Sequence, residues 1–153
     1  MLVFIIITVV LDNIFHVIFT NNLYSLIMLT SIIFINKYFK AKKVLIISII
    51  LGFIFDIMYS NILFLNTYIF ILSSILINYY FRKYKFNIIS IIISANLIII
   101  FYHLIYYLLI LASGNIIDVT VLVKAYIDSI VVNNLYVIFS YFILNRVYSY
   151  KNY

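Results

Sequence analysis

Long apolar runs, separated by short polar breaks, fill almost the whole of this sequence. Of its 153 residues, 68% are hydrophobic and 9% are charged, and the mean hydropathy is +1.26. A soluble domain of this length cannot hide that much apolar surface from water, whereas a lipid bilayer accepts it. The sequence therefore predicts an integral membrane protein.

The breaks divide the chain into six candidate membrane-spanning segments. Each segment is continuously apolar, while the strands of a membrane barrel alternate apolar and polar residues, so helices are predicted in spite of the many β-branched residues. No stretch between them is long enough for a further domain. We expect an all-α bundle of six transmembrane helices forming one polytopic domain over residues 1–153, with spans at roughly 2–19, 23–39, 43–59, 62–80, 87–111 and 124–147.

The basic residues gather in three places that alternate with nearly uncharged connections. Cytoplasmic loops of membrane proteins carry an excess of Lys and Arg, so all three clusters and both termini are predicted to face the cytoplasm. The net charge of +6 is therefore interpreted as a topology signal, and no nucleic-acid partner is expected. The clusters are Lys37, Lys40, Lys42 and Lys43 after the second span, Arg82, Lys83 and Lys85 after the fourth, and Arg146 and Lys151 after the sixth.

The third span carries a stripe of small and polar residues that begins at Ser48. Gly52, Asp56 and Ser60 follow at four-residue spacing and therefore lie on one side of the predicted helix. A charge at the centre of a bilayer costs about 2.5–3.5 kcal/mol even on the insertion scale, so Asp56 is expected to face another helix, a polar cavity or the membrane edge. Because the third span runs outward, Asp56 is placed near the outer leaflet, where its burial need not be extreme. The stripe is predicted to pack against the protein's own helices or to receive the helix of a partner.

Most other ionisable groups within the spans fall in the outer half of the membrane on this orientation. One interpretation is an outward-facing polar pocket or relay, which would include Asp56. The other is a set of independent groups near the interface, with a Lys–Asp pair on one helix face and a histidine in an interhelical hydrogen bond. Nothing in the spacing demands convergence, which favours the second interpretation. The residues of this candidate outer cluster are Asp12, His16, His103, Lys124 and Asp128.

Residue patterns of known enzymes are missing from the sequence. It has no glutamate and no cysteine, no HExxH-like pair, no serine elbow and no glycine-rich phosphate loop. We therefore expect no catalytic residue, no bound metal and no cofactor.

The sequence around Gly52 resembles the rod shape-determining protein MreD family. The matching residues are Gly52, Asp56 four positions later, Leu63 in the turn that follows, and Asn66 near the start of the next apolar run. The resemblance extends to chain length, to the basic loops and to the last span, with Asn133, Asn134 and Arg146. The chain departs from the family at Phe64, where a glycine is usual, and at His103, where an acidic residue is common in the fifth span.

This resemblance implies a non-enzymatic scaffold in the bacterial cytoplasmic membrane. MreD-like proteins are thought to direct lateral peptidoglycan synthesis during cell elongation, and the implied partners are an MreC-like membrane protein, MreB, RodA and a class B penicillin-binding transpeptidase. The family's fold is similar to that of the substrate-binding subunits of energy-coupling-factor transporters. That likeness supplies the alternative, a vitamin- or small-molecule-binding subunit with an outward pocket lined by Asp12, His16, Asp56 and Asp128.

Overall fold

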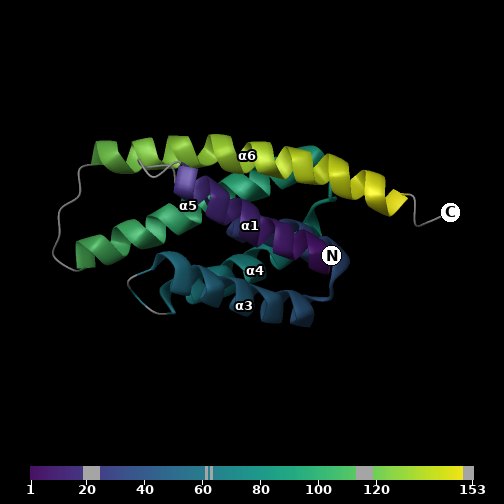
Figure 1. Ribbon diagram of the computed structural model, residues 1–153, viewed down its shortest axis with the longest axis horizontal. Coiled ribbons are helices and arrows are strands. Elements are labelled where there is room, and N and C mark those ends of the chain that lie inside the picture. Colours follow the sequence, from purple (N-terminus) through teal and green to yellow (C-terminus); the bar gives the residue numbers. More distant parts are fainter. Residues whose placement is uncertain (19–24, 61, 63, 113–118, 150–153) are drawn as a thin grey trace.

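The computed structural model describes residues 1–18, 25–60, 62, 64–112 and 119–149. All the regular secondary structure in these ranges is helical, which confirms the predicted all-α class. The N-terminal end of α1 and the C-terminal end of α6 lie on the same side of the molecule (Figure 1). The helices are α1 (Leu2–Ile18), α2 (Ile27–Tyr38), α3 (Ala41–Tyr59), α4 (Leu65–Lys83), α5 (Ile88–Ala112) and α6 (Val119–Ser149).

Two of these helices contain segments long and apolar enough to cross a membrane. They are Ile88–Leu109 in α5 and Val123–Val147 in α6. The apolar segments of the first two helices, Leu2–Val17 and Ile27–Tyr38, are shorter. The described helices thus overlap all six predicted spans, while the passage of each one through a bilayer stays a prediction.

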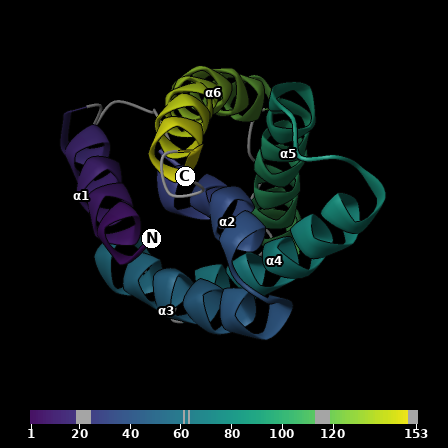
Figure 2. The ribbon, with the colours of Figure 1, turned by 90° about the vertical axis from the view of Figure 1, so that its right-hand side faces the viewer.

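α2 is the centre of the bundle. Figure 2 shows it surrounded by α1, α3, α4, α5 and α6, and it packs against each of them. Its residues from Leu26 to Ile35 are at most 1% exposed, so the helix is buried on every side. A helix that is apolar all round is expected in such a position. The other five helices form a shell around this one.

The length of α2 departs from the prediction of a span at 23–39. The helix has 12 residues, which rise about 18 Å at 1.5 Å per residue, well short of the roughly 30 Å of a hydrocarbon core. It begins inside the bundle, where the backbone N–H of Leu26 donates to Asn133 Oδ1 (3.1 Å) and that of Ile27 donates to Asp12 Oδ1 (2.9 Å). Side chains of the surrounding helices therefore take the place of a preceding helical turn.

The outward faces of the shell helices are apolar. Large hydrophobic side chains more than half exposed occur on α1, α3, α5 and α6, for example Val10, Ile57, Leu104 and Phe139. Exposed apolar surface spread over so many helices is not found on soluble monomers. It is the surface that lipid tails or the helices of another protein would cover.

α3 and α4 form a close antiparallel pair, and Gly52 is the reason that they approach so closely. A Cβ atom at this position would lie 2.6 Å from Thr67 Cα and 3.1 Å from Phe70 Cβ. The first of these atoms belongs to the backbone and cannot move without shifting the start of α4. Small residues allow such backbone contact between membrane helices.

Gly52→Ala should therefore separate the two helices and destabilise the protein by about 1–3 kcal/mol, the usual cost of overpacking. The temperature at which the detergent-solubilised protein loses its folded size-exclusion peak would measure the effect. Ile57→Ala on the exposed face of the same helix is the matched control, because Ile57 is 64% exposed. An unchanged transition temperature for Gly52→Ala would contradict the close contact.

Candidate functional site

Asp56 lies at the junction of α3 and α4 with both carboxylate oxygens fully bonded. Oδ1 accepts from the backbone N–H and from the side-chain amide of Asn66, each at 2.9 Å. Oδ2 accepts from the backbone N–H of Thr67 at 2.9 Å and from its hydroxyl at 2.6 Å. The residue is 1% exposed, which is deeper burial than its expected position near the outer leaflet required.

The donors that surround Asp56 belong to the first turn of α4. The N–H groups of a first helical turn have no partner within their own helix and carry a partial positive charge. No side chain of α4's own N-cap residue supplies the missing acceptor. The carboxylate on α3 supplies it instead, and Tyr106 of α5 extends the junction by donating its hydroxyl to Asn66 Oδ1 at 3.2 Å. One buried carboxylate thus helps to join three helices.

Phe64, immediately before α4, has a left-handed backbone with φ of 69° and ψ of −3°. This conformation is ordinary for glycine and costs other residues roughly 1–2 kcal/mol. The ring of Phe64 stacks on Phe53 of α3, with centroids 5.9 Å apart. The position at which the sequence departs from the glycine of the MreD family is therefore one where the backbone geometry favours glycine.

Asp12 forms a second junction, between α1 and α2. Its Oδ1 accepts from the Ser25 hydroxyl at 2.7 Å and from the Ile27 N–H at 2.9 Å. In both junctions a carboxylate in one helix bonds the N-terminus of the next helix along the chain. The difference lies in the second oxygen, because Asp12 Oδ2 is buried without a hydrogen bond among the described residues.

His16 lies one turn beyond Asp12, and its ring packs on that of Tyr59 with centroids 4.0 Å apart. His16 Nδ1 and the Tyr59 hydroxyl are buried and, within the described ranges, have no hydrogen-bond partner. Together with Asp12 Oδ2 they leave three polar atoms unsatisfied where α1 meets α3. Buried water commonly fills such positions.

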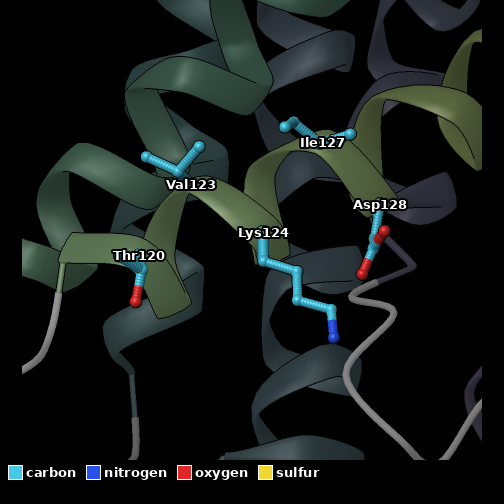
Figure 3. A pocket seen from close by; sticks show the side chains of 5 residues that line it. All are labelled: Thr120, Val123, Lys124, Ile127 and Asp128. Carbon is cyan, nitrogen blue, oxygen red and sulfur yellow. The ribbon is translucent and has the colours of Figure 1, made fainter.

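The remaining members of the candidate outer cluster lie on α5 and α6. His103 Nδ1 is 2.8 Å from the carbonyl oxygen of Ile99 in its own helix, and its ring packs against Tyr126. Lys124 and Asp128 project from the same side of α6 (Figure 3), but the described part of the chain holds no ion pair between them. They border an open cavity of about 340 Å³, and the described residues that line it, which include Thr120, Val123 and Ile127, all belong to α6.

The serines at the ends of the α3 stripe have different surroundings. Ser48 is fully buried and donates its hydroxyl to the Val44 carbonyl at 2.9 Å. Ser60 follows the helix, where its hydroxyl donates to the Ile62 carbonyl at 2.8 Å and accepts from the Ile62 N–H at 3.1 Å. Gly52, Asp56 and Asn66 therefore lie at the α3–α4 junction. Ser60 lies immediately after the end of α3, and Leu63 lies outside the described residues.

Several residues of the junctions were not singled out by sequence reasoning. Thr67 and Ser25 bond the two carboxylates. Asn133, which the resemblance to MreD named without a role, accepts from the start of α2 and donates to the Ser129 carbonyl at 2.7 Å. The signal for Thr67 was available, because Asn and Thr at the start of an apolar run are typical of helix N-termini. The contact of Asn133 with the start of α2 had no such local signal, since the two are far apart in the chain.

The chemistry open to these groups is limited by their bonding. Asp56 has four donors on its two oxygens and has no free oxygen to act as a base or to bind a ligand. No three His, Asp, Glu or Cys side chains within the described ranges come together as a metal site would require. In the part of the chain that the structure describes, the bonding of Asp56 joins helices.

Comparison of the chain with protein-family models, with curated proteins and with solved structures found no match in any of the three.

The two carboxylates should respond differently to amide substitution. Asp56→Asn places an NH₂ group against donors of Asn66 or Thr67, and each buried donor left unsatisfied costs roughly 1–3 kcal/mol. Asp12→Asn can direct its NH₂ group to the side of Oδ2, which has no donor to lose. Thermal unfolding in detergent should show a clear loss for Asp56→Asn and little change for Asp12→Asn. Equal losses would contradict the difference in bonding.

Phe64→Gly and Phe64→Ala both remove the ring contact with Phe53, but only glycine relieves the left-handed backbone. The glycine variant should be more stable than the alanine variant by roughly 1 kcal/mol. Comparing the two transition temperatures cancels the common loss of the ring. A more stable alanine variant would be inconsistent with the observed φ.

Proposed function

We propose that this protein is a membrane scaffold of the MreD type, which helps a bacterial cell-elongation complex to direct lateral peptidoglycan synthesis. It would act through helix contacts with an MreC-like protein and, through that complex, with MreB, RodA and a class B penicillin-binding transpeptidase. The protein would be embedded in the cytoplasmic membrane with six spans and both termini inside.

The observation that carries this proposal is the α3–α4 junction. Gly52, Asp56 and Asn66, the described residues of the motif that resembles MreD, are separated in sequence but converge on the start of α4. Phe64, which replaces the usual glycine, lies in the same turn with positive φ. Motif residues that all take part in one contact between helices support an architecture shared with the MreD family. The same residues scattered over the bundle would support it less.

The residue roles also favour a scaffold over a transporter subunit. A substrate pocket built from Asp12, His16, Asp56 and Asp128 needs these groups to share a cavity. All hydrogen bonds of the Asp56 carboxylate go to the start of α4, and Asp128 borders an open cavity whose described lining residues all belong to α6 and include none of the other three. The apolar faces of the shell helices are instead suited to contacts with other helices within the bilayer.

Depletion of the protein in its own cells tests the proposal. Rod-shaped cells should become wide or spherical, and a fluorescent D-amino acid should no longer mark new wall along the cell side. Plasmid-encoded wild-type protein should restore both cell shape and side-wall labelling. Because Asp56→Leu removes the α3–α4 junction, it should restore neither, even at the same level in the membrane. Normal shape with a growth defect cured by an added vitamin would reject the scaffold and favour the transporter subunit.

Contact with a partner can be trapped by cysteine crosslinking, because the natural chain has no cysteine. Ser48 is a poor position, since it is fully buried. Exposed positions such as Val10 and Phe139 should yield adducts with the MreC-like helix if that helix packs on α1 or α6. If every exposed position gave only crosslinks between two copies of this protein, direct contact with the MreC-like helix would be contradicted.

A further inference from the structure

A groove opens between α4 and α5 on the surface of the bundle. Figure 2 shows the two helices diverging at the end that faces the viewer. The groove has a volume of about 380 Å³, within the roughly 300–1,000 Å³ usual for small-molecule sites. Its walls are almost entirely apolar, with Leu76 and Tyr79 on α4 and Leu97, Phe101 and Leu104 on α5.

The groove is elongated in the direction of α5. From Ser94 to Leu104 its α5 wall rises about 15 Å at 1.5 Å per residue. The wall residues recur every three or four positions, so they form one continuous strip on the helix. For a helix that crosses a membrane, such a strip lies along the direction of the lipid tails. The shape therefore suits an extended hydrocarbon chain.

Positive charge is concentrated at one end of this groove. Arg82 and Lys83 follow Tyr79 by three and four positions and therefore continue the same face of α4. Both are exposed, as is Lys85 in the connection to α5. Tyr79 is itself 71% exposed, and exposed tyrosine rings near the end of a membrane helix usually lie among lipid headgroups. Juxtamembrane Lys and Arg attract anionic lipids.

We propose that the α4–α5 groove is a binding site for one anionic phospholipid. An acyl chain occupies the apolar trough, and the phosphate-bearing headgroup lies against Arg82, Lys83 and Lys85. The site requires the membrane location proposed above but not the role in wall synthesis, so either idea can fail without the other.

The absence of tryptophan from the natural sequence allows a direct test. Leu97→Trp places a single indole in the groove. Phe139→Trp places one on the outward face of α6, where the Phe139 side chain is 65% exposed. Each full-length variant is reconstituted in phosphatidylcholine vesicles containing a small fraction of brominated phosphatidylglycerol or of brominated phosphatidylcholine. The bromine quenches fluorescence on contact. Brominated phosphatidylglycerol should quench the groove indole at least twofold more strongly than brominated phosphatidylcholine, with no such preference on α6.

Charge variants separate a built site from general attraction to the membrane surface. Neutralising Arg82, Lys83 and Lys85 to Gln in the Leu97→Trp background should abolish the preference. Neutralising Lys40, Lys42 and Lys43 to Gln removes the same charge from another basic loop and should preserve it. Native mass spectrometry of the two triple variants should show phosphatidylglycerol retained only by the second.

Three results would overturn the proposal. Equal quenching by both lipids in the groove would mean that only bulk lipid covers it. A preference that survives in the Arg82, Lys83 and Lys85 variant would remove the headgroup contact. Weaker quenching of the groove indole than of the α6 indole by both lipids would show that protein, such as a second copy of the chain, occupies the site.

Discussion

The start of a helix inside an apolar bundle is the constraint on which this structure depends. Backbone N–H groups in the first helical turn lack partners within the helix, and neither lipid nor an apolar core supplies any. A buried carboxylate has the opposite need, because it must find donors to offset its lost hydration. Asp56 at α4 and Asp12 at α2 combine the two requirements, so that each feature makes the other tolerable. The same pairing fixes where one helix of a hairpin meets the next.

The two junctions share this principle but differ in completeness. At α3–α4 the glycine one turn before Asp56 brings the backbones into contact, and all acceptor capacity is directed at α4. At α1–α2 the corresponding position is Thr8, whose hydroxyl is 3.0 Å from that of Tyr136 on α6. Among the described residues of the α5–α6 pair no carboxylate is buried, and an amide pair bridges the helices, with Asn134 donating to Asn96 at 3.0 Å.

The parts of the structure that were predictable are those encoded locally. Continuous apolar runs predicted all six helices, because hydrophobicity and short polar breaks act within a few residues. The four-residue spacing of Gly52 and Asp56 predicted that both would face away from lipid, and the structure places them against α4. The start of α2 at Ile27, later than the expected start at residue 23, was not predictable in this way. Its apolar run gives no sign of a break, and one of its acceptors, Asn133, lies 107 positions from Leu26. The same holds for Lys124 and Asp128, whose helical spacing allowed an ion pair that their rotamers do not form.

The structural use of Asp12 and Asp56 narrows where function can reside. Conspicuous charges inside an apolar chain are normally the first candidates for chemistry or transport. Here the buried carboxylates Asp12 and Asp56 are bonded to helix N-termini. Replacing either one would therefore shift the helices, and a loss of activity would not by itself indicate a reactive role. The surfaces not used by these junctions include the exposed apolar sides of α1, α3, α5 and α6 and the groove between α4 and α5. A protein with rigid internal junctions and an apolar exterior is suited to present fixed helix faces to its neighbours, because its own packing does not need to change when they bind.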